Sequence, residues 1–437
     1  MKKRFLVGLA VLLSVTSGLL ANGLNLNGFG ARATAMGGAF VGLADDFTAV
    51  FFNPAGLAQM TKSSFGLSAD LLMPKSKYGV GPTTIETSSK KYPAGLLGYF
   101  RPVGKNIVVG IGAYTLSGLG AAWDNASPGI EPVLLAGSGL SPSFLTPQGI
   151  DAYNWESFIG SVTIAPTIAI KLSDMFYLGG SFNINYGFFK MDRWAGVYPL
   201  DLNPTSPPNP DTYFNPGQQT LDVKGWGFGA TLGFLVKPAN WISFGGTYRF
   251  ESKMKMSGTM EMENMGVLML ETSSGAKMDV ASPMWLAGGV ALKPVENLTL
   301  TFDAHYTNWA KLTTIVVDFD DPYWTAGLGH GGLQLDWCNK TQLRTGLEYD
   351  FGKIVVRGGY YYDPAPAPDE TLNILTPSFT FNSIAGGFGF KSGGLKADLA
   401  IEYLMGKDRT VASSGHNLPG AYEMNILVPM VSLSYGW

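Results

Sequence analysis

Residues 157–171, SFIGSVTIAPTIAIK, alternate between two kinds of side chain. Phe158, Val162 and other apolar residues share one parity, whereas Ser161, Thr167 and other polar residues share the opposite parity. Successive side chains of a β-strand point to opposite faces, so a period of two predicts a strand with one apolar and one polar face. Such regular alternation over so long a stretch is typical of the wall of a membrane β-barrel.

The same alternation recurs along the chain from residue 63 to its last residue, and it predicts fourteen strands. Their expected positions are 63–73, 92–102, 106–117, 157–171, 175–189, 220–237, 240–254, 277–293, 297–317, 337–351, 354–363, 378–391, 395–405 and 422–437. Tight turns alternate with long connections, which lie near 74–91, 118–156, 190–219, 255–276, 318–336, 364–377 and 406–421. Short turns on the periplasmic side and long loops outside are typical of outer-membrane barrels.

The composition distinguishes a membrane barrel from a soluble β-sandwich. Only 14% of the residues are charged, against roughly 25% in soluble domains, and 57 residues are glycine. The mean hydropathy is only +0.12, and the chain after its N-terminal apolar run has no stretch long enough for a transmembrane helix. We therefore predict an all-β fold, a transmembrane antiparallel β-barrel of about 14 strands at residues 61–437, because a closed barrel pairs every backbone group within its wall.

The two ends of the chain predict export to the outer membrane. Residues 1–21 combine three basic residues, an apolar run and small residues, which is the layout of a signal peptide. Its removal leaves 27 Lys and Arg against 33 Asp and Glu, and this charge of −6 argues against a nucleic-acid partner. The C-terminal VPMVSLSYGW resembles the terminal strand signal of outer-membrane barrels. We expect a multi-pass monomer in the outer membrane of a Gram-negative bacterium, in contact with its lipid.

Residues 22–60 precede the first strand and are predicted to form an N-terminal hatch inside the barrel. A fourteen-strand barrel is wider than its own inward side chains fill, so its lumen is either an aqueous channel or plugged. The segment is rich in glycine and phenylalanine, and Asp45-Asp46 is expected to meet inward-facing Arg or Lys. Pro54 pushes Asn53 out of the helical region, so Asn53, Pro54 and Ala55 form a stiff corner that we expect to act in gating. The alternative is a short periplasmic tail.

Two motif regions carry a family resemblance. Residues 22–60, with the Asn-Pro-Ala motif at Asn53, Pro54 and Ala55, resemble the N-terminal region of the FadL family (OMPP1/FadL/TodX) of outer-membrane transporters for long-chain fatty acids and aromatic hydrocarbons. The stretch YTNW at 306–309 and residues 346–370, GLEYDFGKIVVRGGYYYDPAPAPDE, are similar to the same family. With the strand count and the C-terminus, the resemblance covers nearly the whole mature chain.

The resemblance implies passive uptake of hydrophobic molecules through a fourteen-strand barrel closed by a hatch. Ligand is expected to enter an extracellular apolar groove, pass to a site in the lumen beside the hatch, and leave sideways near a kinked third strand. Here the third strand contains Gly110 and Gly112, which are candidates for weakening the wall.

Candidate ligand-binding residues are apolar or cationic. The apolar candidates are Phe40, Phe47, Phe51 and Phe52 in the hatch and Met260, Met262 and Met265 in the methionine-rich stretch 254–269. An alternative for these methionines is that they continue alternating strands above the membrane. The cationic candidates for a carboxylate ligand are Arg249, Arg344, Arg357 and Lys396, which have luminal parity. They could equally be neutralised by carboxylates of the same faces, Glu251, Glu348, Asp398 and Glu402.

The sequence argues against catalysis. Only His305 has a luminal strand position, and neither a nucleophile motif nor a metal-ligand cluster accompanies it, so we expect it to be a polar part of the lumen lining. We expect no enzyme activity, cofactor or metal. The main alternative to transport is a binding or scaffold component of a protein secretion system, and a general porin is less favoured because of the predicted hatch.

Overall fold

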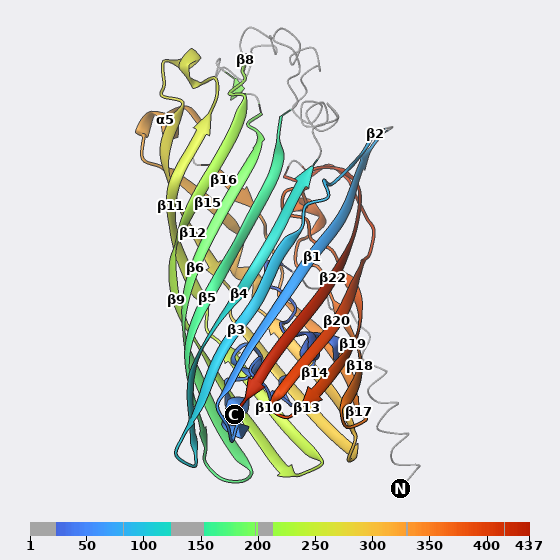
Figure 1. The fold of residues 1–437 in the computed structure, drawn as a ribbon. Helices are drawn as coiled ribbons and strands as arrows, with labels where there is room; N and C mark the ends of the chain where they lie inside the picture. The colour runs from blue at the N-terminus through green and yellow to red at the C-terminus, as the bar shows by residue number, and fades with distance from the viewer. Residues whose placement is uncertain are drawn as a thin grey trace.

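The computed structural model describes residues 23–81, 83–123, 153–196, 198–199, 213–328, 331–414 and 416–437. The predicted signal peptide at 1–21 lies outside the described residues. The chain forms a closed antiparallel barrel of 14 strands, which confirms the predicted fold class, and β1 (Ser64–Val80) pairs with β22 (Gly420–Gly436) to close it. Figure 1 shows this wall, with the N-terminal segment in blue inside its lower half and the C-terminus at the same end.

The wall follows the predicted order, and some of its strands are divided into two pieces. After β1 come β3 (Tyr92–Val103), β4 (Ile107–Trp123), β5 (Trp155–Lys171), β6 (Phe176–Trp194), β9 (Gln218–Ala239), β10 (Ile242–Arg249) with β11 (Ser252–Met262), β12 (Ser273–Ser282) with β13 (Trp285–Val295), β14 (Leu298–Thr307) with β15 (Thr314–Phe319), β16 (Gly331–Gln334) with β17 (Lys340–Asp350), β18 (Ile354–Asp363), β19 (Phe381–Ser392), β20 (Leu395–Gly406) and β22.

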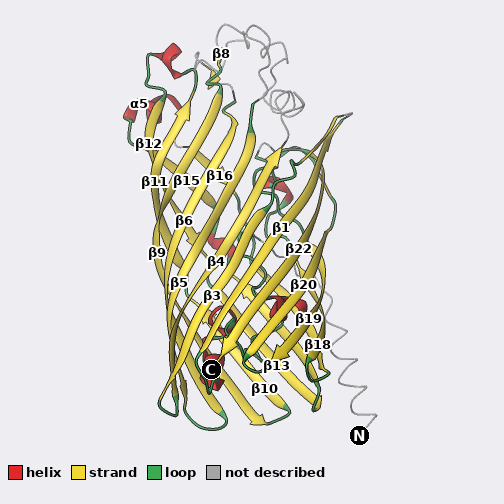
Figure 2. Cartoon of the chain, in the orientation of Figure 1, coloured by secondary structure: helices red, strands yellow, loops and turns green. Residues whose placement is uncertain are grey.

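Small elements lie on the rims and inside the barrel (Figure 2). They are β2 (Thr83–Glu86), β7 (Tyr198–Pro199), β8 (Tyr213–Phe214), β21 (Arg409–Val411), α2 (Ala31–Ala35), α3 (Ala49–Phe52), α5 (Pro322–Leu328), and the 3₁₀ turns η1 (Pro54–Gln59), η4 (Met265–Leu268), η5 (Trp309–Lys311) and η6 (Asp369–Thr371). No helix among the described residues is both long enough and apolar enough to cross a membrane.

Several strands extend further from the membrane than predicted. The connection predicted at 255–276 is wrong in its extent, because β11 continues to Met262 and β12 begins at Ser273. In this stretch buried Met254, Met256 and Met260 alternate with exposed charged or polar residues, so the period of two continues above the membrane. The alternative interpretation of the methionines as part of alternating strands therefore applies to Met260 and Met262.

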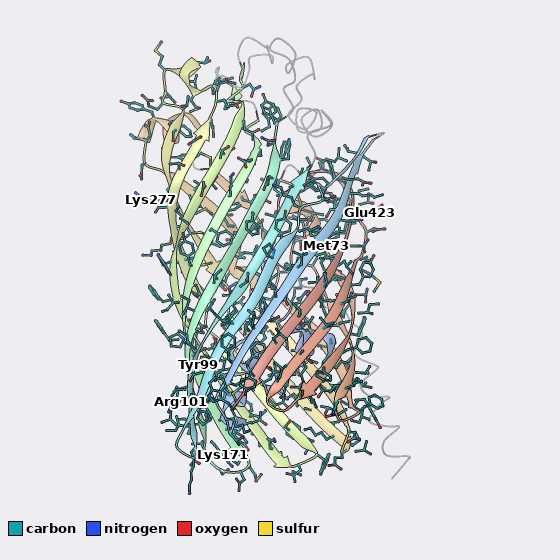
Figure 3. All side chains as sticks on the ribbon, viewed as in Figure 1. Met73, Tyr99, Arg101, Lys171, Lys277 and Glu423 are labelled. Atoms are coloured by element: carbon teal, nitrogen blue, oxygen red, sulfur yellow. The ribbon has the colours of Figure 1, made fainter. Side chains whose placement is uncertain are left out.

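The outer face of the wall carries the apolar band that a membrane requires. The apolar parity of β5 faces outward, with Ile164 and Ile168 exposed, whereas Thr163 and Ser161 of the other parity are fully buried. Near the turn-bearing rim the rings of Tyr99 and Trp437 stack with their centroids 6.1 Å apart. Tyr99 and Arg101 lie near this rim in Figure 3, where aromatic and basic residues meet lipid headgroups.

We expect Ile164→Lys to lower the free energy of unfolding by about 2–4 kcal/mol, because it places a charge on the lipid-facing side of the wall. Urea titration of the protein folded into lipid vesicles measures this change. Leu172→Lys is the control, since Leu172 is exposed just beyond the end of β5. An equal loss in both variants would contradict the assignment of this face to lipid.

Residues 23–60 are packed inside the barrel, where α2 contacts β18, β19, β20 and β22, and η1 contacts β4, β5, β6 and β9. The segment thus reaches from one side of the wall to the other. Where the wall contacts the hatch it contains glycines, which have no side chain and so leave room for the hatch backbone. A Cβ at Gly359 would collide with the backbone of Gly37, and one at Gly179 would collide with the backbone of Pro54 and Ala55.

We expect Gly359→Val to displace the hatch while the barrel still folds, because the new side chain would occupy the space of the Gly37 backbone. Ion conductance in planar lipid bilayers should rise from the closed to an open-channel level. Gly358→Val is the matched control, because a Cβ at Gly358 meets nothing within 4 Å. Unchanged conductance in a folded Gly359→Val barrel would show that the hatch does not block the lumen.

Candidate functional site

The Asn-Pro-Ala motif forms the corner that the sequence predicts. Asn53 has extended backbone angles, φ −160° and ψ 99°, and Pro54 is the first residue of η1. The Asn53 side-chain amide donates hydrogen bonds to Val41 O at 3.0 Å and Phe234 O at 2.9 Å, and its Oδ1 accepts one from Ala55 N. This fully buried side chain therefore joins two parts of the hatch to strand β9 of the wall.

A charged network joins the hatch to the opposite side of the wall. Arg32 of α2 donates to Glu348 at 2.7 Å and also binds Asp45 and Asp46. Glu348 in turn accepts from Arg357, at 2.7 Å. Asp45-Asp46 was predicted to meet a cation of the wall, but its observed ion pairs are with Arg32 within the hatch. Burial alone would raise the pKa of the Asp45 carboxyl, and the Arg32 guanidinium instead holds that pKa below its ordinary value.

Arg357 and Arg344 have partners in the wall and in the hatch. Arg357 also donates to Asp398 at 2.7 Å, so the alternative of neutralisation by carboxylates holds for this residue. The Arg344 guanidinium donates to the backbone carbonyls of Asn27 and Gly37, at 2.8 and 3.1 Å. Hatch carbonyls thus occupy the position that a ligand carboxylate was expected to take beside Arg344.

The third arginine and the hatch phenylalanines form one aromatic cluster. Arg249 donates to Phe51 O at 2.9 Å, and its guanidinium carbon lies 4.8 Å from the ring centroids of both Phe51 and Trp285. Phe40 and Phe52 are fully buried and pack with their ring centroids 5.6 Å apart. These side chains form the core of the hatch.

The remaining candidates lie near the two ends of the barrel. Met260, Met262 and Met265 belong to the buried cluster at the extracellular end, and Phe47 packs against Gly66 of β1. Lys396 is exposed at the periplasmic end of β20.

His305 is buried, with its Nε2 3.3 Å from Asp303 Oδ2 and its ring against Trp285. Within the described residues no group of His, Cys, Asp and Glu side chains could hold a metal ion.

A luminal cavity of about 90 Å³ lies beside the hatch. Its hatch residues are 23 and 25–29, and the wall contributes mainly apolar side chains. The described part of the lining comprises Gly23, Asn25, Leu26, Asn27, Gly28, Phe29, Asp70, Leu72, Ala94, Gly118, Leu119, Pro377, Phe379, Phe381, Glu402, Leu404, Met424, Ile426, Val428 and Met430. This lining includes no lysine or arginine, and its ionisable side chains are two carboxyls.

The connection after β18 folds into the barrel above this cavity. Pro377 and Phe379 line the luminal cavity, whereas Asn373, Ile374 and Leu375 line a second cavity of about 530 Å³ nearer the extracellular end. The connection is fixed from several sides; Trp123, for example, donates to Ile374 O. It therefore separates the two spaces. It continues directly from Pro366-Ala367-Pro368-Asp369, near the end of the stretch 346–370 that carries the family resemblance, which gives that part of the sequence a structural role.

The wall is interrupted between β3 and β4 at the height of this cavity. Pairing of the two strands begins only at Leu96 with Tyr114, and β4 has a bulge between Thr115 and Ser117 in its ladder with β5. A cavity of about 290 Å³ occupies the interruption. It is lined from outside by residues such as Phe158 and Val162, and from inside by the hatch residue Leu26. Met73, labelled in Figure 3, lies next to Leu72 of this lining and marks the height of the interruption.

The N-terminal end of the hatch covers this interruption from the luminal side. Asn25 forms a β-bridge with Ser117, and Gly118 N donates to Leu24 O at 2.9 Å. Gly110 and Gly112 lie elsewhere on the same strand, and both are paired with β3 and β5. The third strand therefore lacks its β3 partner at Ser117–Gly120, after the bulge that follows Thr115, whereas the two glycines named from the sequence are paired on both sides.

The sequence did not identify Arg32, Asp70 and Leu26. Arg32 precedes Asp45 and Asp46 by 13 and 14 positions in the same segment. This combination of charges could have predicted an ion pair within the hatch. Asp70 is a charged residue of luminal parity in the first strand, which was also visible. Leu26 carried no signal, because its role depends on where the hatch meets β4.

The comparison with known families agrees with this architecture. The profile of the family described as "Outer membrane protein transport protein (OMPP1/FadL/TodX)" matches residues 151–435. The chain belongs to this family. As a FadL-family member it is an outer-membrane barrel, as predicted.

Relatives of this FadL-family chain cover nearly its full length. Outer membrane protein P1 of Haemophilus influenzae is 22% identical over 445 residues, which span 89% of this chain and 90% of P1. The structure of a FadL homologue of Pseudomonas aeruginosa superposes with a TM-score of 0.74 at 17% identity, covering 96% of this chain and 99% of its own. The Ralstonia pickettii toluene transporter TbuX gives 0.69 at 17% identity, covering 94% and 99%. The structural similarities establish a shared fold.

We expect Glu348→Ala to weaken the attachment of the hatch of this FadL-family protein by about 2–3 kcal/mol, because it removes hydrogen bonds to two guanidinium groups. Hydrogen–deuterium exchange of residues 31–35 should become faster. Glu86→Ala is the control, since Glu86 and its partner Lys77 are both exposed on the outer surface, and it should leave exchange in the hatch unchanged. Equal exchange in both variants would show that the network does not hold the hatch.

Proposed function

We propose that this protein carries apolar small molecules passively across the outer membrane, by way of the extracellular cavity, the luminal cavity and the interruption between β3 and β4. The single observation that carries the proposal is the shared lining of the last two spaces. Leu26, Leu72, Ala94, Gly118, Leu119, Met424 and Ile426 line both. Among the described residues, these are the side chains that lie between the lumen and the outer surface at this height.

The chemistry of the path fits an apolar cargo. Each buried methylene group contributes roughly 0.8 kcal/mol, so leucine, methionine and phenylalanine side chains bind hydrocarbon better than a water-filled pore does. The interruption opens toward Phe158, Val162 and Phe188 on the lipid-facing side. A molecule that leaves there enters the bilayer without crossing the polar periplasmic end of the lumen.

Gating in this proposal is a movement of the hatch. Leu24 and Asn25 are bonded to the part of β4 that lacks its β3 partner, so a shift of this end would open the luminal cavity to the interruption. The corner at Asn53, Pro54 and Ala55 is the fixed end of the hatch. Arg249, Arg344 and Arg357 act in this proposal by holding the hatch and the wall together.

The ligand class is proposed from the lining and from the family. Fatty acids and neutral hydrocarbons are the two groups of candidates. One structure similar to this chain is that of a toluene transporter, and toluene is small enough to test as a neutral ligand without a polar group. Transport as a role accords with a family of transport proteins.

We expect Gly118→Phe to reduce uptake of radiolabelled toluene to the background of cells without the protein, because the ring would fill the interruption. A Cβ at Gly118 meets only Leu26, at 3.9 Å, so the substitution has room. Gly358→Phe on the lipid-facing surface is the control and should transport normally. Folding of both variants is checked by SDS gel electrophoresis, in which a folded barrel migrates differently before and after heating. Normal uptake by a folded Gly118→Phe variant would exclude this exit.

A further inference from the structure

Two carboxyl groups face the luminal cavity with unused hydrogen-bond acceptors. Asp70 of β1 and Glu402 of β20 are 5% and 4% exposed, and both line the cavity. Asp70 Oδ1 accepts a hydrogen bond from Ser68 at 2.8 Å, whereas Asp70 Oδ2 and Glu402 Oε1 have no partner among the described residues. Buried polar atoms in native proteins are nearly always paired, so two unpaired oxygens in one cavity call for a physical explanation.

The two carboxyls lie on either side of one strand. Asp70 pairs in register with Met430 of β22, and Glu402 pairs with Val428 of the same strand. Neighbouring strands lie about 4.8 Å apart, so the two positions are separated by roughly 10 Å across an apolar floor of Val428 and Met430. This arrangement presents an apolar surface with a hydrogen-bond acceptor at each edge.

No cation in the lining offsets these acceptors. Arg344, one of the candidates from the sequence, donates to Gln342, Asn27 and Gly37 and does not line the cavity. The other inward arginines are likewise bound, Arg357 to carboxylates and Arg249 to Phe51 O. The ionisable groups of the described lining are therefore the two carboxyls alone.

We propose that the luminal cavity selects apolar molecules that carry one O–H or N–H donor, such as phenols or alcohols, over carboxylates. The donor would bond to the free oxygen of Asp70 or Glu402, and the hydrocarbon part would contact Leu72, Phe379 and Met430. A ligand carboxylate would instead bring a third carboxyl group beside Asp70 and Glu402, into a lining whose described residues include no lysine or arginine, and such a charge is costly in an apolar surrounding. This inference rests on the proposed function, of which it specifies the ligand class.

The test uses three ligands of one shape and the purified full-length protein in detergent. Toluene, 4-methylphenol and 4-methylbenzoate differ only in the group at one ring position. Equilibrium binding should rank 4-methylphenol first, about tenfold or more above toluene, since a hydrogen bond to a buried acceptor is gained. 4-Methylbenzoate should bind more weakly than toluene.

Variants assign the preference to the two carboxyls. The double variant Asp70→Leu with Glu402→Leu should lose the preference for 4-methylphenol over toluene while it still binds toluene. Asp363→Asn is the matched control, because Asp363 is a buried carboxyl with an unpaired oxygen that does not line the cavity, and it should keep the preference. Toluene needs no hydrogen bond to either carboxyl. Its binding by the double variant therefore shows that the cavity is intact.

The outcomes separate this inference from the proposed function. If 4-methylbenzoate binds as well as 4-methylphenol, or if the preference survives in the double variant, the selectivity inference is wrong while hydrophobic uptake stands. If none of the three ligands binds to the wild-type protein, the luminal cavity is not a ligand site and the proposed function fails with it.

Discussion

The lumen of a fourteen-strand barrel is too wide for inward side chains to fill. In this protein the hatch fills it, and close backbone contact with the wall holds the hatch in place. Inward side chains alone fill the interior of a barrel of about eight strands, but a wider barrel needs an additional segment or holds water. Here the backbone of residues 35–56 lies directly against glycines of several wall strands, such as Gly179, Gly245 and Gly359. The position of the hatch, and with it the luminal cavity and the covered interruption of the wall, depends on this close approach.

Two sets of polar groups in the lumen differ in their hydrogen bonding. One set, which includes Arg32, Glu348 and Arg357, is mutually paired and holds the hatch, and a paired network of this kind is costly to break. The other set, Asp70 and Glu402, has unused acceptors that face a cavity. Charge alone therefore does not indicate a ligand contact in this lumen. A free acceptor that also lines the cavity distinguishes the two carboxyls proposed to contact a ligand from the side chains that attach the hatch.

The same hatch segment takes part in both the closed wall and the proposed path. Leu24 and Asn25 bond to β4 where β4 lacks its partner β3, so they supply pairing that the barrel itself omits. In the proposed path, displacement of this segment would open the wall to the side without the separation of paired strands.

The alternation of apolar and polar residues by itself determined the barrel, its fourteen strands and their order, because the period of two is a local property of each strand. It also determined the extended corner at Asn53, since Pro54 restricts the residue before it. The sequence placed inward arginines on the correct face, but parity gives a direction and not a partner. Only the tertiary structure decided that Arg344 meets hatch carbonyls, that Asp45 and Asp46 meet Arg32, and that the third strand lacks its β3 partner at Ser117–Gly120. These features depend on how a segment distant in sequence packs against the wall, and no local pattern encodes that contact.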